Sequence, residues 1–111
     1  MRVDEKEALS ILENLGFKFK GEPKQPPEMG AMNYDLEVEK NGVTYAVEVK
    51  TTEKGRRSTV PWEELREMAW QFAVHGKDGL LIFVDRSYGE YCIFKIAHIR
   101  IGLVEKSAPS W

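Results

Sequence analysis

Apolar residues recur with helical spacing in two stretches of the chain. In residues 4–16 the apolar positions are Ala8, Ile11, Leu12 and Leu15. These lie on one side of a helix with 3.6 residues per turn, Asp4 is a typical capping residue, and Gly16 is a typical helix-ending residue. The pattern therefore predicts an amphipathic helix of about three turns near the start of the chain.

Residues 60–76 show a second helical pattern. Its apolar stripe consists of Trp62, Leu65, Ala69, Phe72 and Ala73. Pro61 stands where the first helical residue is expected, and Gly76 stands just past the last turn. Proline at the start and glycine after the end are the usual boundaries of a helix.

Alternating or continuous apolar runs predict the strands. They occupy residues 17–20, the two arms of a hairpin around Asn41-Gly42, residues 79–85 and residues 90–104. The segments 21–32 and 50–59 are polar or rich in proline and glycine, so we expect loops there. The predicted order is α-β-β-β-α-β-β, an α/β fold in which one mixed β-sheet is flanked by helices, and residues 1–111 are expected to form a single domain.

The register of the hairpin follows from its turn. If Asn41 and Gly42 are the central residues of a type I′ turn, Lys40 pairs with Val43 and Asp35 stands opposite Glu48. One face of the hairpin is then apolar, and the other carries Asn33, Asp35, Glu37, Ala46, Glu48 and Lys50. The charged residues thus share one side of the sheet.

The composition limits the class of protein and the cellular compartment that we expect for this domain. The chain is 42% hydrophobic and 31% charged, as in ordinary globular proteins. Cys92 is the single cysteine and the first residues carry no apolar signal, so we expect a reducing, cytoplasmic compartment. The longest apolar run, residues 80–84, is too short to span a membrane. A net charge of −2 lacks the basic excess typical of nucleic-acid-binding proteins.

Two carboxylates directly opposed on adjacent strands repel each other unless a cation lies between them. Asp35 and Glu48 are such a pair. They offer the hard oxygen ligands that Mg²⁺ prefers, with Lys50 on the same face. The alternative is an ordinary solvent-exposed face, on which alternating glutamate and lysine are common.

These residues resemble the PD-(D/E)xK nuclease superfamily, which has the restriction-endonuclease-like fold. In layout they are most similar to the archaeal Holliday-junction resolvases and related small nucleases. The resemblance rests on a helix bearing Glu7, on Asp35, on Glu48-Val49-Lys50, and on a following helix with two strands, so it extends to about Ile96. Tyr34 stands where a proline often precedes the aspartate.

The resemblance implies a site and an activity. Asp35, Glu48 and the backbone carbonyl of Val49 would bind Mg²⁺ or Mn²⁺, and Lys50 would orient or activate the attacking water. Glu7 would be an additional catalytic acid, although Asp4 and Glu7 also have the spacing of a helix capping box. The implied activity is Mg²⁺-dependent endonucleolytic cleavage of duplex or branched DNA, usually by a homodimer.

Further candidates adjoin this site in the sequence. Thr52, Lys54, Arg56 and Arg57 follow the second hairpin strand and would contact the nucleic-acid backbone, or else form a solvated loop. Gln71 on the second helix is a possible accessory residue, because some nucleases of this superfamily place a helical glutamine near the metal. We find no Ser-His-Asp set, no Cys-His zinc spacing and no glycine-rich phosphate loop.

Two hypotheses of different classes remain open. The first is a metal-dependent DNA endonuclease. The second is a catalytically inactive nuclease-fold module that binds nucleic acid or protein, which the low basic charge keeps open. Loss of metal binding on neutralising Asp35 or Glu48 would separate them.

Overall fold

A computed structural model of the chain describes residues 1–23, 34–53 and 59–98. Its elements are α1 (Val3–Asn14), β1 (Lys18–Gly21), β2 (Leu36–Lys40), β3 (Val43–Thr52), α2 (Trp62–His75), β4 (Asp78–Asp85), β5 (Glu90–Lys95) and the 3₁₀ turn η1 (Ile96–His98). The order α-β-β-β-α-β-β predicted from the sequence is confirmed. No helix among these residues is long and apolar enough to cross a membrane.

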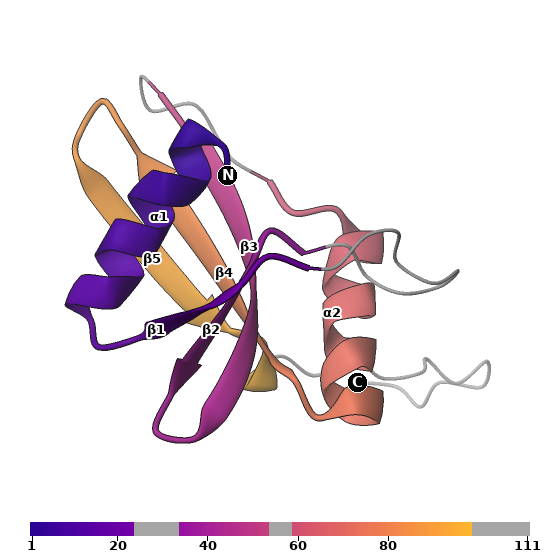
Figure 1. Cartoon of the computed structure of the whole chain (residues 1–111). Helices are drawn as coiled ribbons and strands as arrows, with labels where there is room; N and C mark the ends of the chain where they lie inside the picture. Colours follow the sequence, from indigo (N-terminus) through magenta and orange to yellow (C-terminus); the bar gives the residue numbers. More distant parts are fainter. Residues whose placement is uncertain (24–33, 54–58, 99–111) are drawn as a thin grey trace, which may run out of the picture.

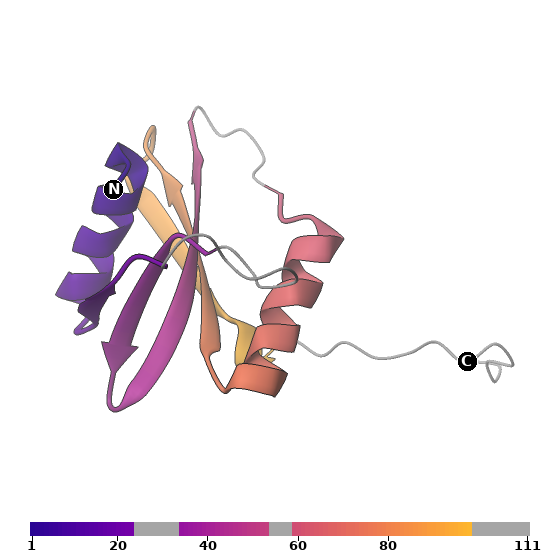
Figure 2. The ribbon, with the colours of Figure 1, turned by 45° about the vertical axis from the view of Figure 1, so that its right-hand side comes forward.

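The five strands form one mixed sheet whose spatial order follows the chain, from β1 to β5. β3 and β4 are parallel, and the other neighbouring strands are antiparallel. A parallel pair needs a crossover connection, and α2 supplies it. α1 covers one face of the sheet and α2 lies on the opposite face, as the two views show (Figures 1 and 2).

The hairpin of β2 and β3 has the predicted register. Lys40 pairs with Val43, and Leu36 pairs with Val47. The turn residues Asn41 and Gly42 have φ values of 52° and 78°, the positive values that a type I′ turn requires. The local turn therefore determines which side chains of the hairpin share a face.

The larger core lies between α1 and the sheet. Its fully buried members are Ala8, Leu12, Leu36, Val38, Val47, Leu80 and Ile82. Phe17, just after α1, packs edge-to-face on Tyr45 of β3, with ring centroids 5.6 Å apart. This packing fixes α1, and with it the N-terminal residues that precede the helix, against the hairpin.

The smaller core lies under α2, and here the predicted stripe is partly wrong. Leu65 and Ala69 face the sheet as expected, but the side chain buried deepest is Met68, which is 2% exposed. Trp62 and Phe72 are 58% and 40% exposed. The side chains of α2 that join the smaller core are Leu65, Met68 and Ala69, whereas the predicted Ala73 is exposed like Trp62 and Phe72.

The last predicted strand, residues 90–104, is also shorter than expected. β5 ends at Lys95, and the chain turns into η1, where Ile96 is 1% exposed and joins Met68 and Leu81. Ile96 thus leaves the alternation of the strand to complete the smaller core, which a pattern of apolar residues does not reveal.

Gly79 in β4 has no room for a side chain. A Cβ atom there would lie 2.6 Å from Cγ1 of Ile96 and 3.1 Å from Cε of Met68. Gly79→Ala is therefore expected to lower the free energy of unfolding by about 1–3 kcal/mol, measured in urea. In an Ile96→Ala background the same change should cost much less, and equal costs in both backgrounds would contradict the proposed clash.

Candidate functional site

Charged residues from four segments meet at one end of the molecule. The N-terminal ends of α1 and α2 lie toward the same end of the sheet, where β2 begins and β3 runs out (Figure 1). The charged residues are Arg2 and Glu5 at the start of α1, Asp35 before β2, Glu48 and Lys50 on β3, and Glu64 in the first turn of α2.

Asp35 is held tightly against β3. Its backbone N–H donates to the carbonyl of Val47 at 2.9 Å, and its Oδ2 accepts the N–H of Val49 at 2.8 Å. Burial raises the pKa of Asp35 above its ordinary value, although the Val49 hydrogen bond and the charge of Arg2 oppose the shift. The carboxylate is therefore fixed in position through Oδ2, and its second oxygen, Oδ1, accepts a hydrogen bond from Arg2.

Glu48 is the most perturbed acid that the structure describes. Its side chain is 13% exposed, and its Oε2 is buried without a hydrogen-bond partner among the described residues. Burial, then the charge of Asp35 and then the contact with Glu64 raise the pKa of Glu48 to about 8. A buried oxygen without a donor is costly, and a cation would satisfy it.

Lys50 shares the face of Glu48, as the alternation of the strand predicted. Its Nζ lies 3.0 Å from Oε1 of Glu64 and 3.7 Å from Oε1 of Glu48. Glu64 therefore holds the ammonium group beside the carboxylates. Glu64 was not predicted from the sequence, although it stands four residues before Met68, on the side of α2 that faces the sheet.

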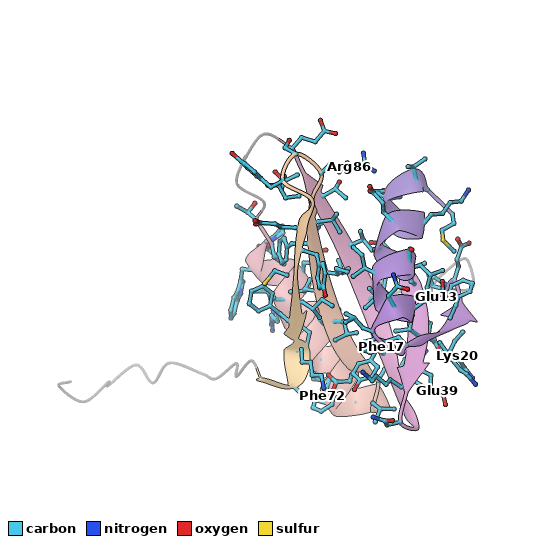
Figure 3. All side chains as sticks on the ribbon, turned by 90° about the vertical axis from the view of Figure 1, so that its left-hand side faces the viewer. Glu13, Phe17, Lys20, Glu39, Phe72 and Arg86 are labelled. Atoms are coloured by element: carbon cyan, nitrogen blue, oxygen red, sulfur yellow. The ribbon has the colours of Figure 1, made fainter. Side chains whose placement is uncertain are left out.

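The helix acid that reaches Asp35 is Glu5, and not the predicted Glu7. Glu5 is 7% exposed and its charge acts to raise the pKa of Asp35. Glu7 is directed to Arg86 in the turn between β4 and β5, with 2.8 Å between Oε2 and Nε, and Figure 3 shows Arg86 beside α1. Glu5 stands three residues before Ala8 and seven before Leu12, so helical periodicity could have identified it.

The start of α1 also differs from the predicted capping box. Oε1 of Glu5 accepts the backbone N–H of Arg2 at 2.9 Å, and Arg2 is the residue that precedes the helix. The predicted pair of Asp4 and Glu7 is thus replaced by Arg2 and Glu5. One oxygen of Glu5 serves the helix end, and the other faces the Arg2 guanidinium at 3.3 Å from Nε.

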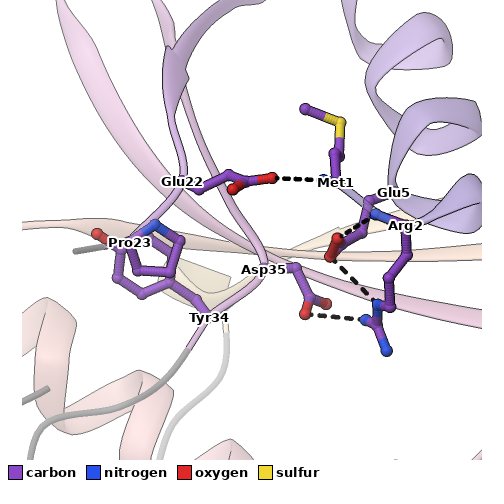
Figure 4. Close-up of a pocket in the computed structure, with 7 residues that line it drawn as sticks. All are labelled: Met1, Arg2, Glu5, Glu22, Pro23, Tyr34 and Asp35. Atoms are coloured by element: carbon purple, nitrogen blue, oxygen red, sulfur yellow. Dashed lines mark hydrogen bonds and ion pairs between the residues drawn. The ribbon is translucent and has the colours of Figure 1, made fainter. Parts of the chain in front are cut away.

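A pocket of about 580 Å³ opens beside these residues (Figure 4). It is lined by Met1, Arg2, Glu5, Glu22, Pro23, Tyr34 and Asp35. On one side, Nη2 of Arg2 donates to Oδ1 of Asp35 at 3.1 Å. The pocket thus places a cationic group next to the fixed aspartate.

Tyr34 is anchored where the chain enters the site. Its hydroxyl donates to Oε2 of Glu37 at 2.6 Å, and Nζ of Lys77 lies 3.1 Å from both oxygens. Lys77 also lies over the Tyr34 ring, 5.4 Å from its centroid. Because Tyr34 directly precedes Asp35, these contacts help to fix the aspartate, and sequence reasoning gave no role to Lys77.

The residues that are present fit a divalent cation. Asp35 and Glu48 supply hard oxygen ligands of the kind that Mg²⁺ and Mn²⁺ prefer, and Oε2 of Glu48 lacks any other described partner. Within residues 1–23, 34–53 and 59–98, no group of three or more His, Cys, Asp or Glu side chains is arranged to hold a metal ion. The candidate centre is therefore a pair of carboxylates, which leaves coordination positions to water and substrate.

The remaining predicted residues are placed only in part. Thr52 ends β3, where its carbonyl accepts the N–H of Arg86 at 3.1 Å. Gln71 lies in α2, and its side chain is outside the described part of the chain. Lys54, Arg56 and Arg57 also fall outside the described residues. The carbonyl of Val49 as a ligand stays a prediction.

The raised pKa of Glu48 predicts a dependence on pH. Between pH 4.5 and about 8 the folded protein retains a proton that the unfolded chain has released, so the metal-free protein is expected to lose stability as the pH rises through this window. Mg²⁺ must displace that proton, so its affinity should rise up to about tenfold per pH unit toward pH 8. Thermal unfolding measured from pH 5 to 9, with Mg²⁺ and with EDTA, tests the predicted loss of stability and the predicted rise in Mg²⁺ affinity. A melting temperature in EDTA that rises over this range would contradict the assignment.

Comparison with known proteins supports the fold. No protein-family model matches the sequence, and no curated protein shows a significant match. The structure of Hjc, a Holliday junction resolvase from Archaeoglobus fulgidus, is similar over 85% of this chain and 75% of that protein, with a TM-score of 0.59 and 16% identity. A structure described as SSO0001 is similar over 83% of this chain and 48% of its own, with a TM-score of 0.44 and 11% identity. The first likeness and the mixed sheet flanked by two helices agree with the prediction, and the chain has the restriction-endonuclease-like fold.

Proposed function

We propose that the chain is a divalent-metal-dependent DNA endonuclease. The observation that carries this proposal is the buried Oε2 of Glu48, which has no hydrogen-bond partner among the described residues, in a carboxyl group whose pKa the charge of Asp35 helps to raise. A protein under no functional constraint would gain stability by replacing such a carboxylate, so perturbed acids of this kind are concentrated at functional sites. The similarity to a Holliday junction resolvase favours DNA as the substrate.

Each residue has a distinct role in this proposal. Asp35 and Glu48 hold the divalent cation, which when bound supplies Lewis-acid stabilisation of the charge that develops on the phosphate. Lys50 holds the attacking water and adds a preorganised positive charge beside the phosphate. Glu64, 3.0 Å from the Lys50 ammonium, keeps that group in position.

A symmetric dimer is part of the proposal. Two copies related by a two-fold axis would present two such sites to two DNA strands. Trp70 on α2 is 59% exposed and offers an apolar contact for a second copy.

The second candidate is a nuclease-fold module that binds without catalysis. It is favoured by the engagement of both Asp35 oxygens, one by Val49 and the other by Arg2, and by the net charge of −2. A protein of this kind would bind DNA or a protein partner and leave phosphodiester bonds intact.

Incubation with linear, nicked, flapped and four-way DNA in the presence of Mg²⁺ or Mn²⁺ distinguishes the two candidates. Cleavage of any substrate that stops on addition of EDTA supports the endonuclease. Binding to one of these DNAs without cleavage, with both metals tested, supports the binding module.

A further inference from the structure

Arg2 pairs with three carboxylates that are much less exposed than Arg2 itself, of which Asp4 is the most distant, 3.8 Å from Nε. Its guanidinium lies 3.3 Å from Oε2 of Glu5 and 3.1 Å from Oδ1 of Asp35 (Figure 4). The Arg2 side chain is 63% exposed, whereas those of Glu5 and Asp35 are 9% and 17% exposed. The anions are therefore fixed in the fold, and their countercharge extends from the surface on a flexible side chain.

The two oxygens of Asp35 are not equivalent. Oδ2 is engaged by the N–H of Val49, a backbone donor that cannot leave without disturbing β3. Oδ1 is the oxygen that remains for another ligand, and Arg2 holds it. A divalent cation that binds Asp35 through this oxygen must compete with the guanidinium, because both positive charges need the same site.

The space beside Arg2 could hold a DNA phosphate, which would bind the guanidinium in place of the carboxylates. The pocket of about 580 Å³ is bordered by both Arg2 and Asp35, so a guanidinium released from the carboxylates stays beside Asp35, with open space for a phosphate group. The planar guanidinium also matches the geometry of phosphate oxygens as well as it matches a carboxylate.

We propose that Arg2 is an exchangeable countercharge: it occupies Oδ1 of Asp35 in the metal-free protein and turns to a DNA phosphate when a divalent cation takes that oxygen. This inference rests on the proposed function and deepens it, since it adds a phosphate-binding residue. Metal and DNA then bind cooperatively, because the cation releases the arginine that the phosphate needs.

The first test measures metal affinity without DNA. Arg2→Ala should bind Mg²⁺ about three- to tenfold more tightly than the parent by calorimetry, because a competing cation has been removed. The backbone N–H that Arg2 donates to Glu5 is retained in this variant, so the helix end keeps its cap. Arg2→Lys keeps the competing charge and should bind Mg²⁺ much like the parent. Arg86→Ala is the matched control, since Arg86 forms its own ion pairs with Glu7 and Glu53 and should leave Mg²⁺ affinity unchanged.

The second test measures DNA binding with Ca²⁺, a cation with similar oxygen ligands, and with EDTA. In Ca²⁺, Arg2→Ala should bind DNA more weakly, with a salt slope about 0.9 smaller because one phosphate is no longer neutralised. In EDTA the parent and Arg2→Ala should bind alike, because Arg2 is then held by the carboxylates. An equal weakening under both conditions would make Arg2 an ordinary surface contact and would overturn the exchange.

The outcomes separate this inference from the proposed function. A parent protein that binds neither Mg²⁺ nor Ca²⁺ overturns both. A parent that binds metal, together with an Arg2→Ala variant of equal or weaker metal affinity, overturns the exchange alone. Unchanged DNA binding by Arg2→Ala in Ca²⁺ overturns the phosphate contact and leaves Arg2 as a structural ion pair.

Discussion

Glu48→Gln is expected to reduce Mg²⁺-dependent DNA cleavage at least about a thousandfold, since the Lewis-acid contribution of a metal ion is worth several kcal/mol and each 1.4 kcal/mol is a factor of ten. The amide keeps the size of the side chain and removes the negative charge. The Mg²⁺ affinity of the Glu48→Gln variant should fall together with its cleavage activity. At a hundredfold excess over its dissociation constant, Mg²⁺ should stabilise the parent by about 2.7 kcal/mol and the variant much less.

The same substitution should make the metal-free protein more stable at high pH. Above pH 8 the parent must bury a charged carboxylate with one oxygen that has no hydrogen-bond partner among the described residues, which costs about 1–3 kcal/mol that the neutral amide largely avoids. Urea unfolding at pH 9 in EDTA, compared with pH 5, measures this difference. A variant that loses cleavage and stability together would instead indicate simple misfolding.

Glu39→Gln is the matched control for Glu48→Gln. Glu39 lies on the same hairpin and forms an ion pair with Lys20, with 3.0 Å between the charged atoms. The Glu39 side chain is 35% exposed, compared with 13% for Glu48. Its neutralisation should leave cleavage and Mg²⁺ affinity unchanged. If both variants lose activity equally, the effect belongs to the net charge of the hairpin, and the assignment of Glu48 fails.

Lys50→Ala is expected to slow cleavage about a hundredfold or more, the usual effect of removing one preorganised electrostatic group from a reacting centre. Metal binding should be retained or tightened, because Lys50 lies 3.7 Å from Glu48 and competes with the cation for that carboxylate. Single-turnover cleavage and calorimetry on the same preparations separate the two effects. Lys50→Arg should not restore the rate, since a planar guanidinium cannot take the place of a compact ammonium between Glu48 and Glu64.

Lys20→Ala is the control for Lys50→Ala. Lys20 is a lysine of β1 that pairs with Glu39 at 3.0 Å, and its removal should leave the rate within about twofold of the parent, as for most exposed ion pairs. If Lys50→Ala cleaves as fast as Lys20→Ala, Lys50 has no catalytic role.

The parts of the fold that could be predicted are those set by local sequence. The Asn41-Gly42 turn determined the register of the hairpin, and the register placed Glu48 and Lys50 on one face of the sheet. The order of elements followed from apolar periodicity. What failed was set by tertiary packing: Ile96 turned inward beside Met68, and this contact ended β5 early.

The residues of the candidate site also fall into two groups, those that local sequence could predict and those that depend on tertiary packing. Asp35, Glu48 and Lys50 lie within one hairpin, so spacing alone could predict that they share a face. Glu5 and Glu64 come from two helices, and their positions depend on how each helix rotates against the sheet. For Glu5 the rotation could have been inferred from the burial of Ala8 and Leu12, whereas Arg2 precedes the helix and has no periodicity to guide a prediction.

The sequential order of the strands bears on how the chain acquires its structure during synthesis. Every strand pairs with its neighbours in the sequence, so the sheet can grow from β1 onward as the chain leaves the ribosome. Glu5, Asp35 and Glu48 all precede the first residue of α2 in the chain, so they leave the ribosome before it. The acidic groups can therefore meet in the nascent chain before α2 covers its face of the sheet. The slow step is then expected to be the parallel pairing of β3 with β4, which must wait for the whole crossover helix.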